Sequence, residues 1–527
     1  MKAMRATTTR IILFSALVFT GFYNVSFFRH VLEVYPFTLK NVGFLISLAA
    51  GLTAVNVILL SLLSWRYTTK PVLILFLLLS SLAAYYMDSY KVVIDYTMIQ
   101  NIVETNFKEA ADLINLKVMA YFFVLGVLPS AIVCWVRLER SSWKKAAVVK
   151  LRDIILAILT IFAVVLLFSK FYTSFFREHK PIRYYANPTY YVYSAGKYIG
   201  RTFHQTRTAL RPIGEDARIP ATDIDRELII LVVGEAARAD HFSLNGYGRE
   251  TNPRLKQEDV VSFTNMTACG TSTAYSLPCM FSIFPRTEFS ENRGQSTENL
   301  LDVLAHAGVH VLWRENNSDS KGVALRVPYE DYRNPAVNPV CDAECRDEGM
   351  LVGLQDYIDA QAQGDIVIVL HQMGNHGPAY YKRYPAAFEK FTPVCRTNQI
   401  EECSREEIDN AYDNALLYTD YFLSRAIELL KSNNNRFETA LIYVSDHGES
   451  LGEYGVYLHG LPYLVAPEVQ KHIAAVFWFG DSFKIDRDAL RRKASRPFSH
   501  DHLFHTILGL MEVETEIYDP RLDIMRN

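Results

Sequence analysis

The stretch Leu228–Val233 reads LIILVV, an unbroken apolar run of strand length. Ile366–Leu370 (IVIVL) and Ala440–Val444 (ALIYV) repeat the pattern, and His310–Trp313 is a weaker fourth run. Short buried strands that alternate with helical patterns are typical of a mostly parallel β-sheet with helices on both faces. The sequence therefore predicts an α/β domain, which we place at residues 226–527. Its helices are expected at Thr297–Ala307, Gly349–Ala362 and Ile408–Leu430.

Acidic and imidazole side chains follow three of these predicted strands. Glu235 follows the first run, Asp446 and His447 follow the third, and the second leads into HQMGNHGP, which contains His376. Ligands of parallel sheets bind beyond the carboxyl ends of the strands, so these groups are expected at one rim. Glu, Asp and His are ligands of zinc in catalytic sites. A DHG triplet alone is common by chance, but the three strand ends together predict a metal site.

A hydroxyl or thiol close to this metal would be its nucleophile. Residues 266–280 read MTACGTSTAYSLPCM, which places Ser272 and Thr273 between Cys269 and Cys279. A Ser/Thr-rich stretch is usually only a loop. A helix that begins near Ser272 or Thr273 would, however, aim free N–H groups at an anion. Zinc would lower the pKa of a nearby hydroxyl and activate it for attack.

Six of the 7 cysteines lie after residue 260 and form three pairs of sequence neighbours. Local pairs in loop-rich sequence indicate disulfides and an oxidising compartment. Free or metal-binding thiols are the alternative, although no pair has CxxC spacing. Cys134 lies in an apolar run and is expected to be a free buried thiol. The pairs, assigned by proximity alone, are Cys269 with Cys279, Cys341 with Cys345, and Cys395 with Cys403.

The first third of the chain is apolar and aromatic, unlike the rest. It contains five runs close to the roughly 20 residues that cross ~30 Å of hydrocarbon. The first run is not a cleaved signal peptide, because no small-residue cleavage site follows it and further runs come after. The sequence therefore predicts a five-helix transmembrane domain at residues 1–175. The runs are Ile11–Phe28, Val42–Leu63, Pro71–Tyr86, Val118–Val136 and Ile154–Phe171.

Basic residues predict how this domain is oriented. They cluster in the N-terminal tail, at Arg66 and Lys70, and between Arg137 and Arg152, on one side of the predicted membrane. The positive-inside rule assigns that side to the cytoplasm. Five crossings then put residues after about 175 on the opposite side, the periplasm of a Gram-negative cell. The disulfides agree with this assignment, and the net charge of −3 gives no reason to expect a nucleic acid partner.

Two segments are expected at the membrane surface. Residues 87–117 would form a periplasmic amphipathic loop, with Met98, Ile99, Ile102 and Val103 at helical spacing. This loop is either a plain connector or a docking surface for a lipid headgroup. Residues 176–225 would form a tyrosine-rich bridging segment into the soluble domain.

These features together resemble the lipid A phosphoethanolamine transferase family, which includes the mobile colistin-resistance enzymes. The resemblance runs the whole length of the chain and implies an alkaline phosphatase/sulfatase-like catalytic domain. No single motif would suffice. The motifs are GEAARADH (234–241), NMTACGTSTAYSLPCMF (265–281), WRENNSDSKGV (313–323), HQMGNHGPAYYKRYP (371–385), SDHGESLGEYGVYLHG (445–460) and SHDHLFHTILG (499–509).

The resemblance implies a role for each matching residue. Thr273 would be both nucleophile and zinc ligand, and His376 and His459 would assist catalysis or hold a second zinc. Cys269–Cys279 and Cys395–Cys403 match family disulfides, whereas Cys341–Cys345 is closer in sequence than expected. The implied zinc ligands are Glu235, Thr273, Asp446 and His447, and the implied substrate-binding residues are Asn317, Lys321, His376, Glu449 and His459. His502 stands where asparagine is expected, and the roles of His500, His502 and His505 stay open.

The reaction implied is transfer of phosphoethanolamine from phosphatidylethanolamine to a lipid A phosphate, through a covalent Thr273 intermediate. One Zn2+ is expected and a second is compatible with the residues. The enzyme would be a monomer of the inner membrane with its catalytic domain in the periplasm. Its product would carry less negative charge and bind polymyxins less well.

Several alternatives stay open. The acceptor could instead be a core sugar, a glucan or a protein, or the group transferred could be phosphoglycerol, as in lipoteichoic acid synthases. The metal-binding set argues against a non-enzymatic lipid-binding scaffold. A sulfatase is disfavoured because neither Cys269 nor Cys279 lies in a CxPxR-type motif.

Overall fold

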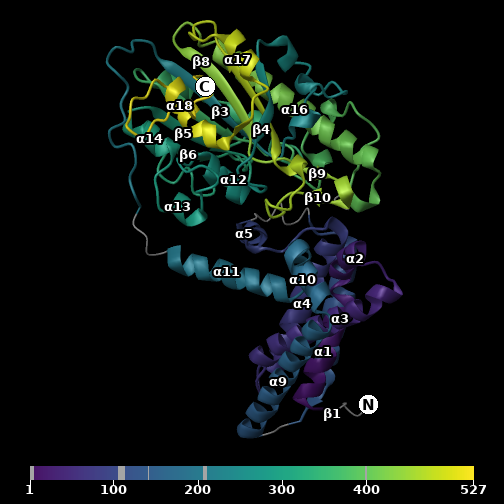
Figure 1. Cartoon of the computed structure of the whole chain (residues 1–527). Helices are drawn as coiled ribbons and strands as arrows, with labels where there is room; N and C mark the ends of the chain where they lie inside the picture. Colours follow the sequence, from purple (N-terminus) through teal and green to yellow (C-terminus); the bar gives the residue numbers. More distant parts are fainter. Residues whose placement is uncertain (1–4, 105–112, 140–141, 206–209, 398–399, 527) are drawn as a thin grey trace. The chain divides into compact units, whose positions relative to one another are not determined.

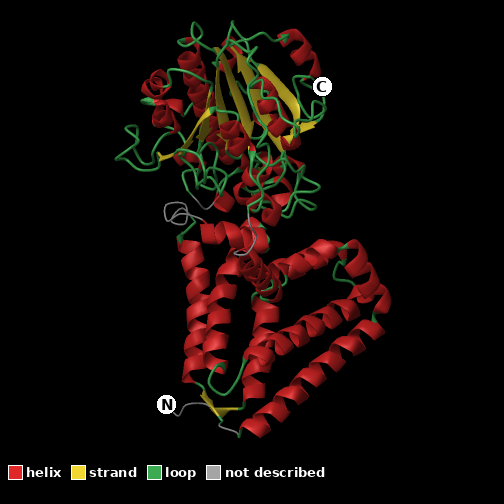
Figure 2. Ribbon diagram, turned by 90° about the vertical axis from the view of Figure 1, so that its left-hand side faces the viewer, coloured by secondary structure: helices red, strands yellow, loops and turns green. Residues whose placement is uncertain are grey.

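The computed structural model describes the chain apart from residues 1–4, 105–112, 140–141, 206–209, 398–399 and 527. The chain divides into two compact units. The first comprises Met1–Ile99 and Ile114–Gly200, and the second comprises Gln100–Leu113 and Arg201–Asn527. Helices dominate the first unit, whereas the second contains a large sheet (Figures 1 and 2).

Long apolar helices build the first unit and account for its membrane-spanning character. α3 (Leu39–Leu63), α4 (Thr69–Tyr90) and the continuous stretch of α7, η1 and α8 (Leu116–Trp135) are each long and apolar enough to cross a bilayer. α1 (Thr8–Phe22) and α2 (Val25–Val34) add a fourth span if this pair, bent by 57°, is counted as one. The described residues thus support three or four spans.

The fifth predicted span is not confirmed. α9 (Trp143–Leu167) is long, but Lys150, Arg152 and Asp153 interrupt it, and it ends at Leu167. Charged groups are costly in hydrocarbon, so too short an apolar stretch is left within this one helix. α10 (Ser169–Glu178) follows directly.

Shorter helices occupy the segments predicted for the membrane surface. α5 (Tyr96–Glu104) contains the apolar positions predicted for the amphipathic loop. Residues 105–112 of that loop lie outside the described part of the chain. α11 (Thr189–Gln205) lies within the predicted bridging segment, after the 3-10 helix η2 (Lys180–Tyr185).

An eight-stranded sheet, in the order β12-β4-β11-β8-β3-β7-β5-β6, forms the centre of the second unit. β3 (Glu227–Gly234) lies between β8 (Glu438–Ser445) and β7 (Ile366–His371) and is parallel to both. β5 (His310–Glu315) is parallel to β7. These four strands contain the four apolar runs from which we predicted the sheet.

The sheet is mixed, which the sequence pattern did not indicate. β11 (His472–Phe479) runs antiparallel to both β8 and β4 (Val261–Thr267). The edge strands β12 (Phe498–Ser499) and β6 (Tyr329–Asp331) pair in parallel with β4 and β5. We did not predict β11 although it reads HIAAVFWF, and apolar content alone does not reveal the direction of a strand.

Helices cover both faces of the sheet, as Figure 1 shows for α16 on one side and α14 and α18 on the other. Alternate β3 residues Ile229, Leu231 and Val233 join the core cluster that also contains α14 and α18. α16 contacts β8 and starts with a capping box at Ser404 and Glu407. The helix bounds are α12 Thr273–Met280, α13 Glu291–Gln295, α14 Leu300–His306, α15 Leu354–Ala360, α16 Arg405–Lys431, α17 Arg487–Lys493 and α18 Leu503–Leu510.

Candidate active site

Four of the predicted site residues meet at the carboxyl-end rim of the sheet. Glu235 follows β3, Asp446 and His447 follow β8, and Thr273 is the first residue of α12. Thr273 is 7% exposed and the other three are 0% exposed. Because β3 and β8 are parallel neighbours, their following residues leave the sheet at the same edge.

The side-chain atoms of these residues lie within contact distance. The Thr273 hydroxyl donates to Glu235 Oε2 at 3.0 Å and lies 3.3 Å from His447 Nε2. His447 Nε2 is 3.4 Å from both Glu235 Oε1 and Asp446 Oδ2. Glu235, Asp446 and His447 thus offer ligand atoms that all lie within 4.8 Å of one another.

Backbone groups orient these side chains so that each keeps one potential ligand atom directed at the middle of the cluster. His447 Nδ1–H donates to the Gly448 carbonyl at 2.8 Å, so the lone pair of Nε2 faces the cluster. Asp446 Oδ1 accepts from the N–H groups of Ala236 and His447. Glu235 Oε1 and Asp446 Oδ2 are buried without a hydrogen-bond partner among the described residues. Such oxygens are costly to bury, so this set fits a cation.

The charge at this rim also favours a cation. Burial lowers the pKa of His447, but the Asp446 and Glu235 carboxylates outweigh it and leave the pKa above its usual value. The negative potential that raises this pKa would equally attract a divalent ion. Carboxylate oxygens and an imidazole nitrogen are among the ligands that zinc takes in proteins.

A second group of ligand atoms shares Glu235. His376 follows β7 and His459 follows β10 (Tyr457–Leu458), and both offer an atom within 4.8 Å of Glu235 and of each other. The His459 ring centroid lies 4.2 Å from that of His447 and 5.6 Å from that of His376. Burial lowers the pKa of His376 and of His459 to about 3, so both rings are neutral near pH 7. Neutral rings suit metal coordination better than proton donation.

Asn317 and Glu449, two of the remaining predicted residues, contact this group. Asn317 Nδ2 donates to Glu235 Oε2 at 2.8 Å and to the Gln372 carbonyl at 2.7 Å, so Asn317 orients Glu235. Glu449 Oε2 is 3.3 Å from His459 Nδ1. Lys321 Nζ donates to the Ser318 carbonyl at 2.6 Å, and its φ of 50° places it in the left-handed region.

Glu315 and His371 support the site, and we did not predict them. Glu315 ends β5 and His371 ends β7, both are 0% exposed, and His371 Nδ1 lies 2.8 Å from Glu315 Oε2. Glu315 Oε1 accepts the Asn317 N–H at 2.6 Å. Burial raises the pKa of Glu315, but the His371 charge and hydrogen bond bring it below its usual value. The sequence did contain a signal for both residues, because each is an ionisable residue at the end of an apolar strand.

The cysteines form three disulfides, Cys269–Cys279, Cys341–Cys345 and Cys395–Cys403. The pairing predicted by proximity is therefore confirmed, including the closely spaced Cys341–Cys345. Cys134 is free, but it is exposed rather than buried. It lies on α8, within an apolar stretch long enough to cross a membrane, where apolar side chains can face lipid instead of a protein core.

Comparison with known proteins places the chain in a family. The model for phosphoethanolamine transferase EptA/EptB matches residues 52–203, and the model for sulfatase matches residues 227–513. Phosphatidylethanolamine transferase Mcr-2 of Escherichia coli is 42% identical, over 94% of this chain and 94% of that protein. This chain belongs to the phosphoethanolamine transferase family. Phosphoethanolamine transferase EptA of Escherichia coli K12 is 40% identical, over 97% of this chain and 96% of that protein.

The similarity to this family extends to the whole fold. The lipooligosaccharide phosphoethanolamine transferase A (EptA) from Neisseria meningitidis matches with a TM-score of 0.94 and 34% identity, covering 99% of each chain. Residues 227–513 thus belong to the alkaline phosphatase/sulfatase superfamily, and the resemblance read from the motifs is confirmed.

Replacing Asn317 with alanine should weaken metal binding and transfer by about 10–100-fold, as expected for a group that orients a metal ligand. The Glu235 carboxylate would lose a 2.8 Å hydrogen bond. Zinc affinity by chelator competition and the transfer rate measure the effect. Asn316→Ala is the matched control, because Asn316 is also buried but donates to Cys345 and Asp347. Equal losses in both variants would contradict this role of Asn317.

Proposed function

We propose that this phosphoethanolamine transferase moves phosphoethanolamine from phosphatidylethanolamine to a lipid A phosphate, through a covalent intermediate on Thr273. The observation that carries the proposal is the Thr273 hydroxyl, 3.0 Å from Glu235 and 3.3 Å from His447. A side chain buried among candidate metal ligands, at the start of a helix, is placed to act as a nucleophile. The Neisseria meningitidis relative is named a lipooligosaccharide phosphoethanolamine transferase, which supports a lipid A-type acceptor.

Glu235, Asp446, His447 and Thr273 are proposed to hold one Zn2+, with His376 and His459 available for a second that shares Glu235. Bound zinc would supply positive charge that lowers the pKa of a hydroxyl and offsets charge on phosphoryl oxygens. Hydrogen bonds with the backbone orient Asp446 and His447 toward the proposed zinc position. The side-chain amide of Asn317 orients Glu235 by a hydrogen bond to its carboxylate.

The first half of the reaction forms the covalent intermediate. Thr273 Oγ1 attacks phosphorus, its proton passes to the Glu235 carboxylate that already accepts it, and the bond from phosphorus to the diacylglycerol oxygen breaks. The leaving oxygen takes up the proton that Glu235 received from Thr273. His376 and His459 are proposed for this step, and because their rings are neutral near pH 7 they would relay a proton rather than store one.

The second half releases the product. A hydroxyl oxygen of a lipid A phosphate attacks the phosphothreonine and gives up its proton, the bond from phosphorus to Thr273 Oγ1 breaks, and the threonine oxygen takes up that proton. Lys321 is proposed to offset charge on the phosphoryl oxygens, and Glu449 to face the ethanolamine ammonium. Positioning and charge are the main means of catalysis in phosphoryl transfer.

The membrane helices are proposed to place this chemistry at the outer face of a Gram-negative inner membrane. The catalytic domain, proposed as residues 226–527, would then lie in the periplasm, where its disulfides are stable. Both substrates are bilayer lipids, so a tethered domain meets them at high effective concentration. Adding ethanolamine would reduce the negative charge of lipid A and weaken polymyxin binding. We propose that a monomer suffices.

Mass spectrometry of lipid A tests this function. Gram-negative cells that express the protein should contain lipid A with added phosphoethanolamine, and cells with the empty vector should not. If phosphoethanolamine is found on a core sugar or glucan while lipid A is unmodified, lipid A is not the acceptor. If Thr273 instead carries glycerol phosphate, phosphatidylethanolamine is not the donor.

A further inference from the structure

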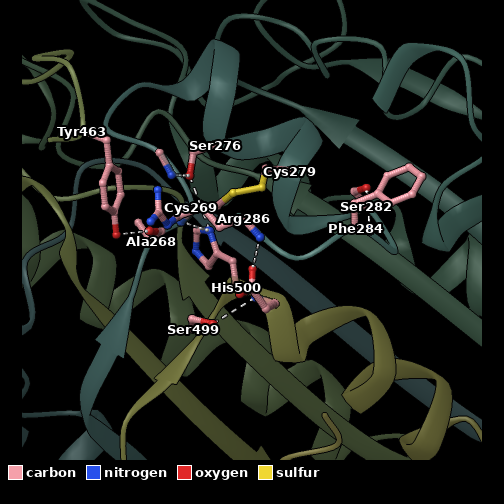
Figure 3. Close-up of a disulfide and its surroundings, with 12 residues drawn as sticks. Ala268, Cys269, Ser276, Cys279, Ser282, Phe284, Arg286, Tyr463, Ser499 and His500 are labelled. Carbon is pink, nitrogen blue, oxygen red and sulfur yellow. Dashed lines mark hydrogen bonds between the residues drawn. A yellow bond between two sulfur atoms is a disulfide. The ribbon is translucent and has the colours of Figure 1, made fainter. Parts of the chain in front are cut away.

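His500 is a buried side chain that joins the segments carrying the site, although it is not among the predicted ligands. It begins the 3-10 turn η12 (His500–His502) and is 1% exposed. Figure 3 shows its ring beside Ser276 and the Cys269–Cys279 disulfide. Nothing in the proposed mechanism uses this histidine.

Both ring nitrogens of His500 are engaged by the backbone of other segments. Nδ1 accepts the Cys269 N–H at 3.1 Å and lies 3.4 Å from Ser276 Oγ. Nε2 donates to the Ser445 carbonyl at 2.9 Å. Because a backbone N–H only donates and a carbonyl only accepts, these contacts define one neutral tautomer. Burial lowers the pKa of His500 to about 4, which is consistent with a neutral ring.

The two sides that His500 joins carry the nucleophile and the candidate metal ligands. Cys269 lies before α12 and is bonded to Cys279 within it, and Thr273 is the first residue of that helix. Ser445 immediately precedes Asp446. Ser276 adds a second link, because its hydroxyl donates to the Asp446 carbonyl and accepts the Gly270 N–H.

We infer that His500 is a positioning residue, which holds the α12 segment against the turn after β8 and so sets Thr273 among Glu235, Asp446 and His447. The inference rests on the proposed role of Thr273. The physical reason is that the two segments belong to different parts of the chain, and among the described strands no pairing joins them directly. A misplacement of about 1 Å between reacting groups costs on the order of 100-fold in rate.

The neighbouring histidines make different contacts. His502 Nδ1 accepts the Ser499 N–H at 3.2 Å within its own turn. His505 Nδ1 accepts the Asp519 N–H at 3.1 Å, and the side chain is 3% exposed. His505 is therefore a matched control, since it is a buried histidine in the same segment with a backbone partner but no contact to Cys269 or Ser445.

The test compares His500→Ala, His500→Gln and His505→Ala in the full-length protein in detergent. Both alanine variants should lower the melting temperature. Only His500→Ala should lower kcat for phosphoethanolamine transfer, by about 100-fold, with KM changed little. His500→Gln should recover part of kcat, because its amide can still donate to the Ser445 carbonyl. Zinc affinity, measured by chelator competition, should fall in His500→Ala and be unchanged in His505→Ala.

Two results would overturn the inference. One is a His500→Ala protein with the kcat and zinc affinity of the wild type, and the other is an equal loss in His505→Ala. If His500→Ala does not fold, the same comparison is made with His500→Gln. A wild-type protein that transfers no phosphoethanolamine contradicts the proposed function instead, and the zinc affinities of the variants then decide the inference by themselves.

Discussion

Thr273→Ala is expected to reduce phosphoethanolamine transfer by at least about 10,000-fold, the scale of losing a catalytic nucleophile. The hydroxyl is the group that would bond to phosphorus, and alanine leaves no oxygen at that position. Wild-type protein incubated with phosphatidylethanolamine and no acceptor should accumulate phosphoethanolamine on the peptide that contains Thr273. Intact-protein and peptide mass spectrometry measure this adduct, and the variant should show none.

Thr271→Ala is the control for this prediction. Thr271 lies two residues earlier and is equally buried at 7% exposure, but its hydroxyl donates to the Leu461 carbonyl at 2.6 Å. Loss of that hydrogen bond should lower stability modestly and leave the adduct in place. An adduct that persists in Thr273→Ala, or that disappears only in Thr271→Ala, would assign the nucleophile to another residue.

Removal of bound metal is expected to abolish transfer, with a loss of at least about 100-fold, because metal ligation is proposed to activate the hydroxyl and offset phosphoryl charge. Added Zn2+ should restore activity, whereas Ca2+ and Mg2+ should not, since an imidazole nitrogen is among the ligands. Asp446→Asn should show the same loss without a chelator, because its Oδ2 lies 3.4 Å from His447 Nε2. Metal content by elemental analysis and transfer rate are measured together.

Asp420→Asn is the matched control for Asp446→Asn. Asp420 is also buried, at 1% exposure, but it lies in α16 and accepts the N–H groups of Arg254 and Leu255. It should keep wild-type zinc content. Full transfer by protein freed of metal would contradict the need for an ion. Equal zinc loss in both variants would contradict the assignment of Asp446 as a specific ligand.

Apolar runs were sufficient to locate the neighbouring strands β3, β7 and β8. β3 and β7 are buried along their length and β8 along all but its first residue, so each contains a run of apolar residues. β11 has the same apolar character but was not predicted, because a short apolar run by itself does not distinguish a strand from a buried helix. For α9 the apolar content led to a predicted membrane span that is not confirmed, since its apolar residues do not all lie in one uncharged helical stretch.

The candidate metal ligands were predictable for a topological reason. Glu235 and Asp446 directly follow apolar strands predicted to be parallel, and the carboxyl ends of parallel strands lie at one edge of the sheet. That these two strands are direct neighbours is seen only in the structure. The choice among hydroxyls was not predictable in this way. Residues 271–273 read TST, and only the similarity to a known family distinguished Thr273 before the contacts were seen.

The apolar strands, the chemistry at their ends and the local cysteine pairs could be predicted, since each depends on residues close together in the chain. The contacts of Thr273 with Glu235 and of Thr271 with Leu461, and the place of His500 between Cys269 and Ser445, are known only from the folded structure. Those contacts join segments up to 231 residues apart, and no periodicity or spacing records them. They arise only when packing brings the segments together and each buried polar atom must find a partner.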